Sequence, residues 1–69
     1  MSLGNRVREL RAKRQLTQQD LAEAVDVTRQ TIVALEKGSY IPSLLLAMNI
    51  ARVFSKPIEE IFYLEEDHK

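Results

Sequence analysis

The sequence contains no cysteine and no tryptophan, and it has only two glycines and two prolines. Without cysteine the chain forms neither disulfide bonds nor thiolate metal sites, which fits a reducing cytoplasm. No apolar run approaches the roughly 20 residues that span a bilayer, and the first residues lack the apolar centre of a signal peptide. We therefore expect a soluble, cytoplasmic protein with no membrane partner.

The net charge of zero conceals an uneven distribution along the chain. Residues 1–56 contain nine Lys or Arg and five Asp or Glu, a net charge of +4, whereas residues 57–69 carry a net charge of −4. The basic body is compatible with a polyanionic partner, although an evenly solvated surface often carries as much charge. With 69 residues, we expect one domain over residues 1–64 and an acidic tail over residues 65–69.

Nothing in the sequence indicates catalysis. It has no nucleophile–base pair, no cluster of metal ligands and no glycine-rich phosphate loop. The single histidine, His68, follows three acids in the tail, and a solvated side chain explains it more simply than a metal ligand does. We expect no enzyme activity, no cofactor and no metal.

Hydrophobic periodicity and helix-capping residues predict five helices and no strand. The first helix covers residues 3–14, and its apolar face carries Leu3, Val7 and Leu10. The fourth follows the N-cap Ser43 and contains the sequence LLLAMNIARVF. The fifth begins at Pro57 and ends at about Phe62, where the polar tail follows.

The second and third helices are short and close together in the sequence LTQQDLAEAVDVTRQTIVALEKG. The second begins at the N-cap Thr17, with Asp20 as its reciprocal capping partner. The third begins at the N-cap Thr28 and ends at Gly38, for which we predict a left-handed conformation. A connection as short as AVDV crosses two helices steeply, which is the geometry of a helix-turn-helix motif.

These sequence patterns resemble those of a known family. Residues 5–62 resemble the Cro/phage-repressor type of helix-turn-helix DNA-binding domain, the XRE family, in the pattern LTQxxLAxxVxVTRQTIxxLEKG, followed by PSxxLAxxIA and PIEEIF. The resemblance implies an all-α, compact five-helix bundle of the lambda-repressor-like type, with the helix-turn-helix in the second and third helices. It also implies a homodimeric transcriptional regulator, more often a repressor, that binds a palindrome in double-stranded DNA.

One position departs from the pattern of this family. Its turn between the second and third helices usually has glycine where this chain has Asp26. We predict a positive φ at Asp26, a conformation that glycine takes freely and that aspartate tolerates better than most residues.

The exposed face of the third helix, residues 28–37, carries the candidate base-reading residues. Arg29 and Gln30 lie in its first turn, where a recognition helix meets base edges. Arginine donates two hydrogen bonds to guanine, and glutamine pairs bidentately with adenine. Val33 and Ala34 are candidates for contact with thymine methyl groups. The alternative for all four is an ordinary solvated helix face.

Five further residues are candidates for phosphate binding: Thr17, Gln18, Lys37, Ser39 and Tyr40. In the resembled family the start of the second helix points at a DNA phosphate, which implicates Gln18. Thr17 and Ser39 have an alternative role as capping and turn residues, and the ring of Tyr40 has an alternative role in the core.

The resemblance also implies a structural pair. In this family Arg11 and Glu36 would form a partly buried ion pair that holds the first helix to the third. Separately, the fourth helix and the C-terminal end have more apolar residues than one core face needs. We predict that these form a homodimer patch of Leu45, Met48, Phe62, Tyr63 and Leu64, the alternative being that they complete a small core.

Two other functions remain open at this stage. An antitoxin-like protein-interaction module would mask a toxin as its partner and also bind its own promoter. Few residues follow the fifth predicted helix, which leaves little chain to wrap a toxin. The other alternative is a DNA-packing or accessory domain that binds DNA with little sequence preference.

Overall fold

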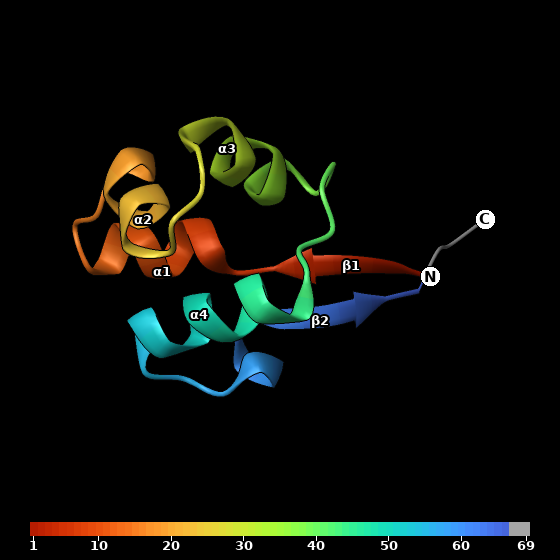
Figure 1. Cartoon of the computed structure of the whole chain (residues 1–69). Coiled ribbons are helices and arrows are strands. Elements are labelled where there is room, and N and C mark those ends of the chain that lie inside the picture. The colour runs from red at the N-terminus through yellow and green to blue at the C-terminus, as the bar shows by residue number, and fades with distance from the viewer. Residues whose placement is uncertain (67–69) are drawn as a thin grey trace.

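The computed structural model describes residues 1–66, and these form four α-helices, one 3-10 turn and a two-stranded sheet (Figure 1). In chain order the elements are β1 (Ser2–Asn5), α1 (Val7–Lys13), α2 (Gln18–Ala24), α3 (Arg29–Lys37), α4 (Leu44–Phe54), η1 (Ile58–Glu60) and β2 (Phe62–Glu65). The predicted solvated histidine, His68, lies outside the described residues. The division between a domain over residues 1–64 and an acidic tail stays a prediction.

The prediction of a first helix over residues 3–14 is wrong at its N-terminal end. Ser2–Asn5 forms β1, and α1 begins only at Val7. Strand β1 pairs antiparallel with β2, which places Leu3 opposite Leu64. Leu3 does pack against the core, as the helical pattern required. The prediction that Leu3 points into the core was therefore correct, but Leu3 belongs to a strand and not to a helix.

The predicted fifth helix is also wrong, and with it the prediction of an all-α fold without strands. The segment after Pro57 makes a single 3-10 turn, in which Glu60 N–H donates to Pro57 C=O at 3.0 Å. The next bond, from Ile61 N–H to Ile58 C=O, is 2.9 Å long. The chain then straightens into β2, so the fold is mostly helical with a small terminal ribbon.

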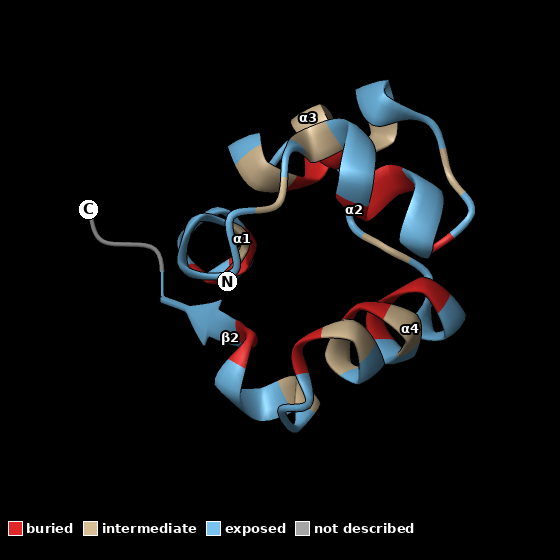
Figure 2. Ribbon diagram, turned by 90° about the vertical axis from the view of Figure 1, so that its left-hand side faces the viewer, coloured by how far each residue is buried: buried red, intermediate tan, exposed pale blue. Residues whose placement is uncertain are grey.

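One hydrophobic core joins these elements. Its buried residues come from α1, α2, α3, α4 and the segment that leads into β2: Val7, Leu10, Leu21, Ala22, Val25, Ile32, Leu35, Leu46, Ala47, Ile50, Phe54, Ile61 and Phe62. Figure 2 shows the buried faces of the helices turned toward the same interior. Burial of these side chains is the main driving force for helices that are too short to be stable alone.

Arg14 ties the end of α1 to the end of α4. Its guanidinium donates to the carbonyl oxygens of Val53 at 3.2 Å and Phe54 at 2.9 Å. These carbonyls belong to the last turn of α4, which favours a positive charge. The ends of two helices that are distant in sequence are thus held together.

The predicted helix caps are confirmed. Thr17 and Asp20 form the reciprocal capping box at the start of α2. The hydroxyl of Ser43 accepts from Leu46 N–H at 3.1 Å at the start of α4. Gly38 ends α3 with a φ of 83°. Sequence signals that act over three or four residues therefore fixed the ends of these helices correctly.

The predicted positive φ in the helix-turn-helix turn is confirmed as well. Asp26 has a φ of 61°, in the left-handed region. Its side chain is exposed, and within residues 1–66 it forms no hydrogen bond or ion pair. Within the described residues no side-chain contact therefore offsets the steric cost of this conformation, and the only local bond is from Asp26 N–H to the Glu23 carbonyl at 3.3 Å.

We predict that Asp26→Gly raises the free energy of unfolding by roughly 0.5–1 kcal/mol, because glycine adopts positive φ without the steric cost of a Cβ. Asp26→Ala is the matched control, and it should be less stable than Asp26→Gly. Urea denaturation of the purified proteins measures both. A lower stability for Asp26→Gly than for the parent chain would contradict the prediction.

Candidate nucleic-acid interface

Helices α2 and α3 pack against each other along one side of the molecule (Figure 1). The tight connection between them is closed by a hydrogen bond from Val27 N–H to Ala22 C=O at 2.9 Å. Val25 and Ile32 are buried where the two helices meet. Because both helices use their apolar faces for this contact, the opposite face of α3 is left at the surface.

The first turn of α3 presents two long polar side chains. Arg29 and Gln30 are both exposed, and within residues 1–66 their side chains form no hydrogen bond or ion pair. The turn itself is fixed, because the Thr28 hydroxyl accepts from Thr31 N–H at 3.3 Å and lies 3.0 Å from the Thr31 hydroxyl. A rigid helix start thus carries unpaired donors and acceptors.

Most residues of α3 that were predicted to face outward are at least partly exposed in the structure. Lys37 is exposed, and Val33 and Ala34 are half-buried at the edges of the face. Ile32 and Leu35 are fully buried on the opposite side. The arrangement leaves a continuous surface along α3 that starts with Arg29 and Gln30 and ends with a cation.

Arg11 and Glu36 form the ion pair that the resemblance implied. Arg11 Nε donates to Glu36 Oε2 at 2.8 Å and Arg11 Nη2 donates to Glu36 Oε1 at 3.2 Å. The two side chains are only 16% and 5% exposed. The hydrogen bond to Glu36 raises the pKa of the Arg11 guanidinium, which stays charged.

The pair is the centre of a larger junction. Arg11 Nη1 donates to the carbonyl oxygen of Leu16 at 2.8 Å, and Gln18 Nε2 donates to Glu36 Oε1 at 3.2 Å. The junction therefore connects α1, the loop before α2, the first residue of α2, and α3. Sequence reasoning gave Gln18 a role in phosphate binding and missed its bond to Glu36.

Thr17 and Ser39, two of the candidate phosphate-binding residues, have the alternative roles of capping and turn residues. The Thr17 hydroxyl accepts from Asp20 N–H, and Thr17 N–H donates to Asp20 Oδ2, both at 2.9 Å. This bond from Thr17 N–H, with help from the hydroxyl, lowers the pKa of Asp20. The Ser39 hydroxyl donates to the Ala34 carbonyl at 3.2 Å. Tyr40, by contrast, is 40% exposed, so its ring does not fill the core.

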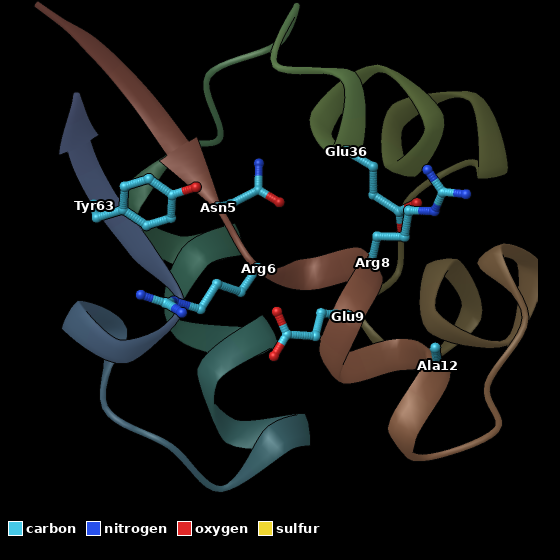
Figure 3. Close-up of a pocket in the computed structure, with 7 residues that line it drawn as sticks. All are labelled: Asn5, Arg6, Arg8, Glu9, Ala12, Glu36 and Tyr63. Carbon is cyan, nitrogen blue, oxygen red and sulfur yellow. The ribbon is translucent and has the colours of Figure 1, made fainter. Parts of the chain in front are cut away.

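The predicted dimer patch is divided by the structure. Leu45, Met48 and Leu64 are 70%, 54% and 70% exposed. Phe62 is 7% exposed and belongs to the core, so its inclusion in the patch was wrong. Tyr63 lies on the other face of the ribbon, where the guanidinium of Arg6 sits 5.4 Å from its ring centroid (Figure 3).

Sequence reasoning missed two exposed apolar residues beside this patch. Ile41 and Leu44 are 74% and 71% exposed, and they precede or begin α4. The run LLL offered a signal, because three successive leucines cannot all lie on one inward face of a helix. The largest concentration of exposed apolar side chains therefore lies around the start of α4.

Sequence reasoning also missed Asn5, which holds the C-terminal end of α3. Asn5 Nδ2 donates to the Leu35 carbonyl at 2.9 Å, and its Oδ1 accepts from Val7 N–H at 3.1 Å. One side chain thus satisfies a carbonyl near the end of α3 and an amide at the start of α1. No local signal announces a bond between residues 30 positions apart.

Among residues 1–66 there is no helix long and apolar enough to cross a membrane. Nor do His, Asp or Glu side chains in this part of the chain gather in a group of three that would hold a metal ion.

The sequence matches a family model described as helix-turn-helix over residues 7–61. It is 53% identical over 64 residues to the HTH-type transcriptional regulator YgzD of Bacillus subtilis, covering 93% of this chain and 97% of that protein. It is 33% identical over 57 residues to the cryptic phage CTXphi transcriptional repressor RstR of Vibrio cholerae, covering 83% of this chain and 51% of that repressor.

The fold is similar to that of a solved regulator. The crystal structure of the restriction-modification controller protein C.AhdI from Aeromonas hydrophila superimposes with a TM-score of 0.74 at 29% sequence identity. The superposition covers 80% of this chain and 83% of that one. The similarity therefore extends over most of both chains.

We predict that the ion pair between Arg11 and Glu36 contributes strongly to the free energy of unfolding. Arg11→Met should lower the free energy of unfolding by about 3 kcal/mol, because it leaves the Glu36 carboxylate buried with only the Gln18 amide as a donor. Glu36→Leu should be similarly costly, and the double variant should lose less than the sum of the two. Urea denaturation of all four proteins gives this coupling energy.

The matched control is the exposed pair on the same helix, Lys13 and Glu9, whose charged atoms lie 3.5 Å apart. Lys13→Met should cost less than about 1 kcal/mol, because water already solvates both groups. Additive effects of the Arg11 and Glu36 substitutions would show that the pair does not hold the junction.

Proposed function

Because the chain belongs to the XRE-type helix-turn-helix family of transcriptional regulators, we propose that it binds double-stranded DNA sequence-specifically with α3 in the major groove. The observation that carries this proposal is the first turn of α3. There, Arg29 and Gln30 extend from a capped helix whose other face is locked into the core.

Base reading would be divided between the first turn and the middle of α3. Arg29 would donate two hydrogen bonds to guanine O6 and N7, and Gln30 would pair with adenine N6 and N7. Each such contact is worth about 1–3 kcal/mol of discrimination against a wrong base. Val33 and Ala34 would supply the apolar surface that favours a thymine methyl group.

Phosphate contacts would position this face on the duplex. Lys37 and Tyr40 are exposed near the C-terminal end of α3, where the DNA backbone would run beside the groove. The amide of Gln18 and the hydroxyls of Thr17 and Ser39 lie next to α3 and would add weaker contacts. The Thr17 hydroxyl would do so while still accepting from Asp20 N–H, whereas the Ser39 hydroxyl would have to release the Ala34 carbonyl, because it has one proton to donate.

Repression is the regulatory outcome that the similarity to RstR favours. A chain that occupies an operator in the major groove blocks access to the promoter by its presence alone. The antitoxin-like alternative, in which a toxin is the main partner, predicts instead that DNA binding is weak without that partner.

A homodimer would read a palindromic operator. Two copies related by a twofold axis would place their α3 helices about 34 Å apart, one turn of DNA. The exposed side chains Ile41, Leu44, Leu45 and Met48 form the apolar surface that a second copy would cover, because monomers rarely expose such a group to water.

The first test selects bound duplexes from a random DNA library with the purified protein at about 0.1 M salt. We expect a palindrome to be recovered. Arg29→Ala should still bind it but should lose the preference at one base pair in each half-site, by about 1–3 kcal/mol. Recovery of no preferred sequence would reject sequence-specific binding and favour a protein partner.

The second test concerns the dimer. We expect the parent chain to sediment as a dimer and the double variant Leu45→Glu, Met48→Glu to sediment as a folded monomer, because both side chains are exposed and the core residues of α4 are unchanged. The separate variant Leu64→Glu reports whether the ribbon contributes. A dimer that survives the double substitution would place the interface elsewhere.

A further inference from the structure

A cleft between α1 and α3 opens beside the proposed DNA-binding face. Its volume is about 420 Å³, and it is lined by Arg8, Arg11, Gln18, Val33, Glu36 and Lys37. Three of these side chains are cations and one is an acid, so the lining has a net charge of +2. Because the charge of Arg11 is matched by Glu36 at 2.8 Å, the excess charge belongs to Arg8 and Lys37.

Arg8 lies on the wall of this cleft that α1 forms. It is exposed, and within residues 1–66 its guanidinium forms no hydrogen bond or ion pair. Figure 3 shows its side chain extending from α1 toward α3, where it lies beside Glu36. An exposed guanidinium without a hydrogen-bond partner is available to an anion, and its planar fork matches the geometry of a phosphate group.

The opposite flank of α1 differs in charge. There Lys13 lines a second cleft with Arg6 and Lys56, but the acids Glu9, Glu59 and Glu60 line the same cleft and match these cations in number. Lys13 is itself paired with Glu9. If α1 were simply basic all round, both of its flanks would carry excess positive charge. The excess is found only on the flank that faces α3, as expected for an anion-binding site there.

We propose that Arg8 and Lys37 bind one phosphodiester of the DNA backbone from the two walls of this cleft. The inference rests on the proposed function, since it requires α3 to lie in a groove of the duplex. Val33 and Lys37 belong both to the cleft and to the outward face of α3, so a strand that borders the groove passes over its mouth. This contact sets the register of α3 without reading a base.

The test measures salt dependence with two probes, the duplex recovered by selection and a random-sequence duplex of the same length. Fluorescence anisotropy gives the binding constant of each variant between about 0.05 and 0.2 M salt. For Arg8→Gln we expect the slope of log K against log salt to fall by about 0.9 per bound protomer, with both duplexes weakened by the same factor. Arg8→Lys should keep the parent slope.

The matched control is Lys13→Gln, which removes a cation from the same helix on the acid-lined flank. It should keep the parent slope, and circular dichroism should show that all the variants are folded. An unchanged slope for Arg8→Gln would overturn the proposal, as would an equal fall for Lys13→Gln.

The same data separate this inference from the proposed function. If the parent chain binds both duplexes equally but only Arg8→Gln lowers the slope, the phosphate site stands and sequence-specific reading fails. If the parent chain prefers the selected duplex and Arg8→Gln leaves the slope unchanged, the reading stands and the phosphate site fails. Absence of any DNA binding would overturn both.

Discussion

The ion pair between Arg11 and Glu36 fixes the place at which three helices meet. Two charges that are only 16% and 5% exposed cannot separate without leaving one of them poorly hydrated, so the distance between α1 and α3 has little freedom. The bonds to the Leu16 carbonyl and from the Gln18 amide extend the same constraint to the start of α2. The orientation of α3 relative to α2 follows from this junction and from the apolar contacts beneath it.

The ribbon of the two chain ends supplies the second support. Arg6 N–H donates to Ile61 C=O at 2.8 Å, and Asn5 carries the constraint onward to the end of α3. The ribbon also explains Gly4, because a Cβ at that position would overlap the ring of Tyr63. Both supports act on the last turn of α3, at Leu35 and Glu36. The first turn is held by the Thr28 cap and by the buried Ile32, while Arg29 and Gln30 stay unpaired. This combination of a rigid backbone and available side chains is what base reading requires.

Local signals predicted much of this fold, and long-range pairing explains the rest. The caps Thr17, Thr28 and Ser43 act over three residues, so the sequence predicts the starts of α2, α3 and α4. Strand β1 depends on partners some 60 residues away, such as Ser2 with Glu65, and its sequence SLGN has little strand propensity. The inward direction of Leu3 fits a helix as well as a strand, so the hydrophobic pattern predicts a helix there.

The candidate site likewise combines features that local sequence signals predict with features that depend on long-range contacts. The outward face of α3 follows from helical periodicity, and the positive φ of Asp26 follows from the glycine that the resembled family usually has at this position. The ion pair of Arg11 and Glu36 came from family resemblance, and neither residue has a local signal for it. The bond from Asn5 in β1 to α3 and the cleft at Arg8 depend on which elements the fold places together, so only the structure reveals them.

The junction and the ribbon would together present the exposed face of α3 to DNA. The most direct measurement is an NMR titration of the isotope-labelled chain with the selected duplex, in which the shift of each backbone amide is followed. We predict that the largest changes fall on residues 28–37 and on Gln18, with residues 49–60 little affected. Changes confined to α4 and the ribbon, with α3 unperturbed, would contradict the account.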